Sequence, residues 1–135
     1  MIVWVNGCFD VLHIGHIELL RYAKNLGDKL IVGIDSDERV KELKGDTRQF
    51  NNQFDRTEML RAIKYVDQVV IFNSEKELIA SIDKYNVHTM VVGDDYKDKE
   101  VIGSENAKKV MFFQKLDNYS TTHILEYENI CNSKK

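Results

Sequence analysis

Five short apolar runs, each followed by polar or turn-forming residues, constrain the fold of this chain more than any other feature. They cover residues 2–5, 30–34, 68–72, 89–92 and 109–113. Short runs rich in β-branched residues and bounded by turn residues are typical of buried strands. The segments between them have the spacing of amphipathic helices, and strands alternating with helices predict a parallel sheet with right-handed crossovers. We therefore expect an α/β fold, in which helices cover both faces of a five-stranded parallel sheet.

The helices are expected from the spacing of apolar residues and from capping side chains. Their expected ranges are residues 14–26, 36–43, 55–64, 74–85 and about 120–130. A capping box pairs a short polar side chain with Glu or Gln three residues later, and Asp55 with Glu58 and Ser74 with Glu77 resemble this pattern. The run Ser120-Thr-Thr122 offers capping hydroxyl groups for the last helix.

Length and charge limit the classes of protein to which this chain can belong. Its 135 residues match the commonest size of one domain, and we assign residues 1–130 to that domain and residues 131–135 to a C-terminal tail. The net charge of −3 leaves no basic excess for a nucleic-acid backbone. No apolar run approaches the ~20 residues that span a bilayer, and no signal-peptide pattern opens the chain, so we expect a cytoplasmic protein without membrane contact. Cys8 and Cys131 are expected to be thiols.

The segment after the first apolar run contains Gly7 and two histidines three residues apart, His13 and His16. Ligands of parallel α/β folds bind beyond the carboxyl ends of the strands. If the helix begins near His13, both imidazoles lie in its first turn, where free N–H groups and the helix dipole attract anions. Gly7 allows a ligand to approach closely, so these features favour a nucleoside triphosphate site. In the alternative, one histidine caps the helix and the other is incidental.

A polar stretch, residues 44–53, is the longest break in the pattern of strands and helices. It contains Lys44, which can approach a phosphate as a point charge, and Arg48, which can bind one through two N–H groups. Gly45 supplies a hinge, and we expect this loop to order over bound nucleotide and acceptor. In the alternative, Lys44 and Arg48 belong to a solvated charged loop together with the acidic residues beside them.

The string Asn6-Gly-Cys-Phe-Asp-Val-Leu-His-Ile-Gly-His16 resembles the first signature of the cytidylyltransferase-like family, a Rossmann-like branch of the nucleotidyltransferases that contain the HxGH motif. The resemblance extends over roughly residues 1–126 and implies a single Rossmann-like domain. It implies that His13 and His16 bind and stabilise the phosphates of the reacting nucleotide, while Cys8 and Phe9 contribute backbone contacts. Such a transfer depends on positioning and electrostatics, and no covalent nucleophile is required.

Further binding residues are implied by the same resemblance. Ser120, Thr121 and Thr122 match the family's second signature, whose hydroxyl and N–H groups hold the outer phosphates. Arg56 matches an arginine that opens the family's third helix and is expected to bind phosphate. A Mg²⁺ ion is expected to bridge phosphate oxygens, because this ion commonly takes few protein ligands. Asp10 is the best candidate beside it, although its side chain could instead cap the turn.

Three further stretches sharpen the resemblance toward heptose 1-phosphate adenylyltransferases. They are residues 41–48, residues 93–96 with 102–104, and residues 117–124. Gly93 and Asp94 are expected at the nucleotide, although Asp94 and Asp95 could form an acidic turn instead. Glycerol 3-phosphate cytidylyltransferases, the nearest rival family, carry a similar Gly-Asp-Asp segment. Gln49, Asp94 and Tyr119 also depart from the heptose pattern, so the acceptor stays open at this point.

The resemblance implies particular partners. These are a nucleoside triphosphate, with ATP favoured and CTP as the alternative, a sugar or polyol phosphate, and a second copy of the chain in a homodimer. An alternative of another class is a non-catalytic nucleotide-binding module, which the loss of His16 or of the Ser-Thr-Thr run would favour. Both features are present. Class I aminoacyl-tRNA synthetases also contain His-Ile-Gly-His strings, but this chain lacks their Lys-Met-Ser-Lys-Ser-like motif.

Overall fold

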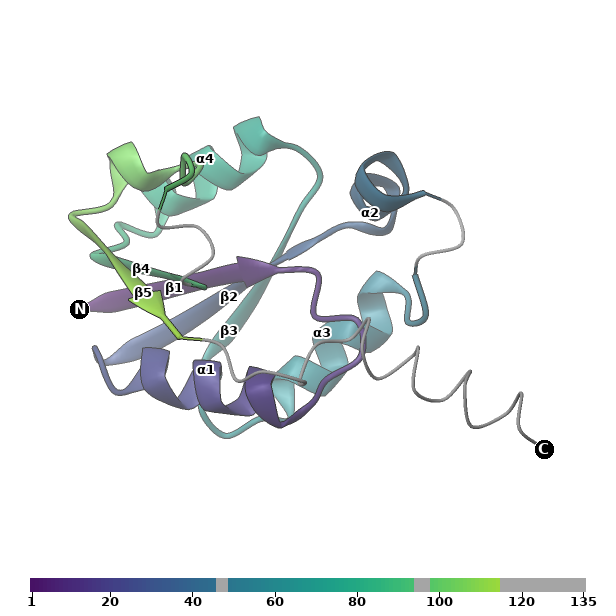
Figure 1. Ribbon diagram of the computed structural model, residues 1–135, viewed down its shortest axis with the longest axis horizontal. Helices are drawn as coiled ribbons and strands as arrows, with labels where there is room; N and C mark the ends of the chain where they lie inside the picture. The colour runs from purple at the N-terminus through teal and green to yellow at the C-terminus, as the bar shows by residue number, and fades with distance from the viewer. Residues whose placement is uncertain (46–48, 94–97, 115–135) are drawn as a thin grey trace.

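The computed structural model describes residues 1–45, 49–93 and 98–114, in which strands and helices alternate along the chain (Figure 1). In chain order the elements are β1 (Ile2–Gly7), α1 (Ile14–Lys24), β2 (Lys29–Asp35), α2 (Asp37–Lys44), α3 (Gln53–Arg61), β3 (Gln68–Phe72), α4 (Glu75–Lys84), β4 (Thr89–Gly93), the 3-10 helix η2 (Ser104–Asn106) and β5 (Lys109–Phe113). All five expected strands are present. The helix expected from residue 120 and the tail 131–135 lie outside the described residues.

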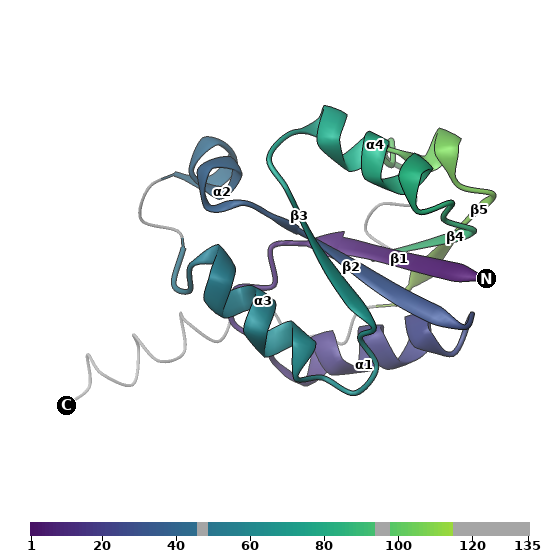
Figure 2. The ribbon, with the colours of Figure 1, turned by 180° about the vertical axis from the view of Figure 1, so that it is seen from behind.

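The strands form one parallel sheet in the order β3-β2-β1-β4-β5. The chain builds outward from β1 through β2 to β3, and then crosses to the other side of β1 to add β4 and β5. Figures 1 and 2 show α1 and α3 on one face of the sheet and α4 on the other, whereas α2 lies beyond the ends of the strands. The expected α/β fold is confirmed. The reversal of strand order at β1 opens a crevice at its carboxyl end, where ligands of such sheets bind.

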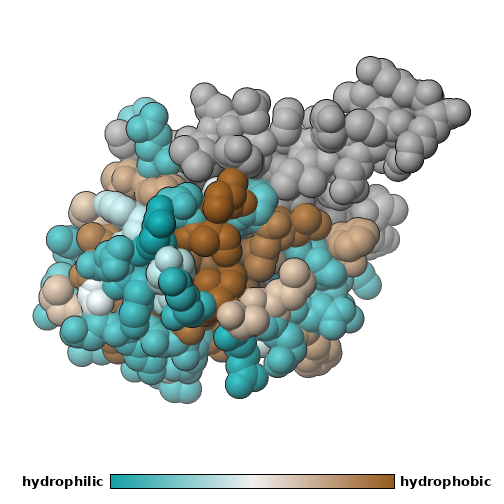
Figure 3. All heavy atoms as spheres, turned by 90° about the horizontal axis from the view of Figure 1, so that it is seen from below, coloured by the Kyte–Doolittle hydropathy of each residue, from teal (hydrophilic) through white to brown (hydrophobic). Residues whose placement is uncertain are grey.

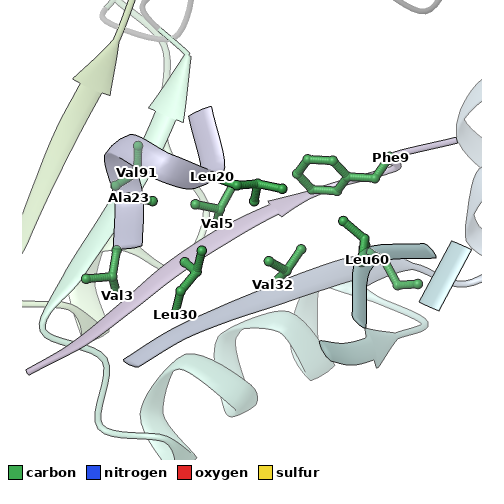
Figure 4. Close-up of a cluster of buried hydrophobic side chains, with 10 residues drawn as sticks. Val3, Val5, Phe9, Leu20, Ala23, Leu30, Val32, Leu60 and Val91 are labelled. Atoms are coloured by element: carbon green, nitrogen blue, oxygen red, sulfur yellow. The ribbon is translucent and has the colours of Figure 1, made fainter. Parts of the chain in front are cut away.

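Successive residues of β1 face opposite sides of the sheet, and each side has its own hydrophobic cluster. Val3 and Val5 pack with Leu20 of α1 and Leu60 of α3 (Figure 4). Trp4 points the other way and packs with residues around α4, namely Ile31, Leu78, Ile82 and Met90. A parallel strand covered on both faces is expected to be apolar throughout, and this explains the unbroken run at the start of the chain.

Polar side chains and local turns set the ends of the helices. Ser74 accepts the N–H of Glu77 at 3.1 Å, so the Ser74 half of the capping box expected at α4 is confirmed, whereas the Glu77 carboxylate accepts the N–H of Asn73 instead. The capping box expected from Asp55 and Glu58 is wrong, because α3 begins earlier and Asn52 accepts the N–H of Asp55 at 2.9 Å. Asp55 therefore lies inside the first turn. α1 and α3 also end before their expected limits, in backbone bonds of the i→i+3 type.

Several large apolar side chains remain exposed on and beside α1 and α3. Phe50 and Phe54, near the start of α3, are 73% and 68% exposed, and Ile14 and Met59 are exposed as well. Figure 3 views the molecule from below, the side of α1 and α3, and shows apolar side chains gathered in the middle of this face. Contiguous exposed apolar surface is typical of an interaction site. Across the described ranges, no helix is both long and apolar enough to cross a membrane.

Candidate active site

A cavity of about 490 Å³ opens at the carboxyl ends of the central strands, as the strand order predicts. The residues expected at the ligand that line this cavity are Gly7, Cys8, Phe9, Asp10, His16, Lys44 and Gly93. Its wall also includes Asp35 and Arg39, which the sequence did not single out. Segments far apart in the chain therefore meet at one site.

The turn between β1 and α1 has an unusual backbone at Phe9, whose φ is +52°. This left-handed conformation is uncommon for a bulky residue and persists only where the surroundings hold it. Phe9 is 6% exposed, and its ring lies beyond the end of β1, near Leu20 and Leu60 (Figure 4). A Cβ atom at Gly7 would approach Phe9 Cε2 to 3.2 Å, so a glycine there leaves room for the ring. The packing of Phe9 thus fixes the path of the chain toward the histidines.

His13 and His16 form a reciprocal cap at the start of α1. His13 Nδ1 accepts the N–H of Gly15 at 3.0 Å, and His16 Nδ1 accepts the N–H of His13 at 3.2 Å. Their ring centroids lie 3.9 Å apart. The alternative in which one histidine is incidental is therefore wrong, because both take part in the cap. Since each Nδ1 accepts a hydrogen bond, each neutral ring carries its proton on Nε2, which makes Nε2–H a donor.

Arg56, which was expected to bind phosphate, is not among the residues that line the cavity. Its side chain is fully buried, and its guanidinium donates four hydrogen bonds to oxygen acceptors of the protein. Nη1 donates to the carbonyl groups of Cys8 and Asp35 at 2.9 and 2.8 Å, Nε to that of Asn51 at 3.1 Å, and Nη2 to the carboxylate of Asp37 at 2.9 Å. Arg56 thus ties together the ends of β1 and β2, the start of α2 and the segment before α3.

Asp10 joins the turn after β1 to the segment before α3. Its carboxylate is buried and accepts the backbone N–H groups of Phe50 and Asn51, both at 2.6 Å. The Asn51 side-chain amide donates back to the Asp10 carbonyl at 2.7 Å. Asp10 therefore holds a distant segment rather than merely capping its own turn.

The pKa of the Cys8 thiol depends on its burial and on the charged groups around the end of β1. Burial raises the pKa of its thiol, the positive charges of Lys44 and Arg56 oppose this rise, and the negative charges of Asp10 and Asp35 add to it. Burial is the largest of these effects. The thiol is therefore held in its protonated form at neutral pH, which is poorly suited to nucleophilic attack. This agrees with a transfer that needs no covalent nucleophile.

The start and end of α2 both contribute to the cavity. Arg39 Nε donates to Asp35 Oδ1 at 2.8 Å, which links the first turn of α2 to the end of β2. Lys44 was expected in the loop but is the last residue of α2, because the N–H of Gly45 donates to the Lys41 carbonyl at 3.0 Å. Gly45 then leaves the helix with a φ of +91°, a conformation that favours glycine.

Several expected site residues cannot be placed relative to the cavity. Arg48, Asp94, Ser120, Thr121 and Thr122 lie outside the described residues. Within the described ranges, no cluster of three or more His, Cys, Asp or Glu side chains could hold a metal ion. This finding is compatible with Mg²⁺ bound through substrate phosphates, because such an ion needs only one or two protein carboxylates.

The Rossmann-like sheet, the cavity at its switch point and the two imidazoles that cap the first helix fit the nucleotidyltransferases with the HxGH motif that the sequence resembles. The sequence profile of the cytidylyltransferase-like family matches residues 4–131, and the chain belongs to this family. The fold also resembles the crystal structure of the lipopolysaccharide core biosynthesis protein from Thermoplasma volcanium GSS1. That comparison has a TM-score of 0.72 and 23% identity, and covers 87% of this chain and 98% of the other.

Curated relatives are more similar in sequence. The bifunctional protein HldE of a Nitratiruptor species is 50% identical over 132 residues, which are 96% of this chain and 28% of the relative. The bifunctional protein HldE of Campylobacter fetus subsp. fetus is 48% identical over 123 residues, which are 91% of this chain and 27% of the relative. The chain thus spans about a quarter of the length of these relatives.

Proposed function

We propose that this chain transfers the adenylyl group of ATP to heptose 1-phosphate and releases pyrophosphate. The observation that carries the proposal is the pair of imidazoles at the start of α1, whose Nε2–H groups are set as donors by the cap. The similarity to HldE proteins supports a nucleotidyltransferase domain. The choice of heptose 1-phosphate rests on the resemblance of residues 41–48, 93–96, 102–104 and 117–124 to adenylyltransferases of that substrate.

In the proposed reaction, a phosphate oxygen of the acceptor attacks the α-phosphorus of ATP. A new P–O bond forms while the bond to the leaving pyrophosphate breaks, and the electron pair of that bond leaves with pyrophosphate. His13 and His16 would donate from Nε2–H to phosphate oxygens, and Lys44 would neutralise further negative charge. Donors that are already oriented stabilise charge in the transition state without reorganisation. The buried hydrogen bonds of Arg56 and Asp10 would keep these donors in place.

The cavity suggests where each substrate would lie. Val92 and Ile102 contribute apolar surface on the β4 side, which suits a nucleotide base. Asp35, Arg39 and Lys44 make the β2–α2 side polar, which suits a sugar phosphate. The two substrates would then meet above the end of β1, beside the histidines. When bound, Mg²⁺ would neutralise the phosphates, and Asp10 is the carboxylate of the cavity wall that we propose beside it.

Two further features belong to the proposal. A homodimer is supported by the exposed apolar side chains of Phe50, Phe54 and Met59, because a second copy would remove them from water. We also propose a cytoplasmic location, because the proposed reaction uses ATP. Four residues would contact the nucleotide through their backbone rather than through their side chains, namely Gly7, Cys8, Phe9 and Gly93.

The test is pyrophosphate release, measured with ATP and CTP against heptose 1-phosphate, other sugar 1-phosphates and glycerol 3-phosphate. We expect the fastest turnover with ATP and heptose 1-phosphate. Preference for CTP and glycerol 3-phosphate would replace the proposal by the rival cytidylyltransferase activity. Nucleotide binding without pyrophosphate release in every combination would leave only a nucleotide-binding module.

A further inference from the structure

Asp35 and Arg39 form an ion pair on the polar side of the cavity that the proposed transfer step does not use. Asp35 ends β2, and Arg39 lies in the first turn of α2. Arg39 Nε donates to Asp35 Oδ1 at 2.8 Å, and the guanidinium carbon lies over the Phe72 ring, 5.6 Å from its centroid. Two contacts therefore fix the orientation of the guanidinium.

The pair is largely buried but keeps unused hydrogen-bonding capacity. The side chains of Arg39 and Asp35 are 12% and 15% exposed, and both line the cavity. Among the described residues, Arg39 Nη1 and Nη2 donate no hydrogen bond and Asp35 Oδ2 accepts none. Burial of an ion pair costs desolvation that mutual attraction offsets only in part, so stability is a weak reason for its presence. These atoms are accessible from the cavity, so a ligand bound there can contact them.

The chemistry of the pair favours hydroxyl groups as that ligand. A guanidinium N–H beside a carboxylate oxygen presents a donor and an acceptor side by side. Each hydroxyl group of a sugar both donates and accepts, so two neighbouring hydroxyl groups match this arrangement. A phosphate would be repelled by the Asp35 carboxylate, and an apolar group would leave the polar atoms unpaired.

We propose that Asp35 and Arg39 bind neighbouring hydroxyl groups of the sugar acceptor and thereby select a polyhydroxylated substrate. This inference rests on the proposed function and adds specificity-determining residues to it. Lys44, five residues after Arg39 on α2, lines the same cavity and supplies the net positive charge that the ion pair lacks. The acceptor can therefore place its phosphate toward Lys44 and its hydroxyl groups at the pair.

The ribose of the nucleotide also has neighbouring hydroxyl groups, so the experiment must separate the two substrates. Arg39→Lys keeps the charge but removes the forked donor, and Asp35→Asn removes the charge but keeps an oxygen acceptor. Arg61→Lys is the matched control, because Arg61 is exposed on α3. Steady-state pyrophosphate release gives KM separately for ATP and for heptose 1-phosphate, and monodeoxy analogues of the sugar phosphate probe individual hydroxyl groups.

In Arg39→Lys we expect KM for heptose 1-phosphate to rise about 10-fold or more, while KM for ATP changes by less than about twofold. Asp35→Asn should also raise KM for heptose 1-phosphate. Arg61→Lys should have the KM values of the wild-type protein for both substrates. The wild-type protein should discriminate against at least one deoxy analogue, and Arg39→Lys should lose that discrimination. Circular dichroism checks that each variant is folded.

An increase in KM for ATP alone would assign the pair to the ribose and overturn the inference. Unchanged KM for both substrates in both folded variants would also overturn it, because the pair would then be structural. Calorimetric titration with heptose 1-phosphate alone supplies a readout independent of turnover. If the wild-type protein binds this compound but never releases pyrophosphate, the proposed reaction fails. Binding weakened about 10-fold in Arg39→Lys would still support the pair, and equal binding would exclude it.

Discussion

Replacement of Arg56 by alanine tests whether this side chain stabilises the fold or binds a phosphate group of the nucleotide. The change would leave three backbone carbonyl groups and the Asp37 carboxylate without their donor inside the protein. Loss of one partner of a buried charge pair costs about 3–5 kcal/mol, and each orphaned buried acceptor costs about 1–3 kcal/mol. Water can reach Asp37, whose side chain is 30% exposed, so these costs do not simply add. We expect the free energy of unfolding to fall by about 3–5 kcal/mol.

Urea denaturation followed by circular dichroism measures this loss from the midpoint and slope of the transition. Arg61→Ala on the same helix is the control, because its side chain is 66% exposed and its loss should cost less than about 0.5 kcal/mol. Arg56→Lys keeps the charge but cannot reach four acceptors, so we expect a loss of about 2–3 kcal/mol. If Arg56→Ala stays within about 1 kcal/mol of the wild-type stability while nucleotide affinity falls, Arg56 is a phosphate ligand and our assignment is wrong.

Other substitutions test the remaining assignments. His16→Ala should lower turnover by about 10²-fold or more with the fold intact by circular dichroism, and its combination with His13→Ala should be less than multiplicative; multiplicative effects would give the two rings independent roles. Lys44→Ala should reduce turnover while changing stability by less than about 0.5 kcal/mol, since this side chain is exposed, and a loss of stability without loss of turnover would refute its role. Because burial raises the pKa of the Cys8 thiol, its alkylation by iodoacetamide should reach half its maximal rate at a higher pH than that of a free thiol. Peptide mass spectrometry distinguishes Cys8 from Cys131, and half-maximal labelling at or below the pH of a free thiol would contradict this prediction.

Local patterns predicted the sheet and the position of the histidine motif well, because strands buried on both faces leave continuous apolar runs. Element ends were harder to predict. Asn52 and Asp55 are both good capping residues, and only the position of α3 against the sheet decides that Asn52 takes the cap. Lys44 joined α2 for a similar reason, because a backbone bond from Gly45 extends the helix by one residue.

Other parts of the candidate site could not be read from the sequence because they depend on contacts between distant segments. An arginine near the start of a helix looks the same whether it faces solvent, a phosphate or the interior, and Arg56 is buried only because β1 and β2 end beside it. Asp35 and Arg39 have the four-residue spacing of many surface ion pairs. Their place in the cavity emerges only when β2 and α2 are set against β1.

Arg56 and Asp10 together explain how a strained turn can hold two histidines in a fixed position. Phe9 adopts a backbone conformation that costs roughly 1–3 kcal/mol, and the residues on either side of it are held by hydrogen bonds from other segments. Arg56 binds the Cys8 carbonyl before it, and Asp10 after it accepts two N–H groups from the segment that precedes α3. Because Arg56 also binds the Asn51 carbonyl, that segment cannot shift without disturbing the turn. Phe50 and Asn51 are therefore anchored to the turn that leads to His13, and the positions of this turn and of the start of α3 are coupled.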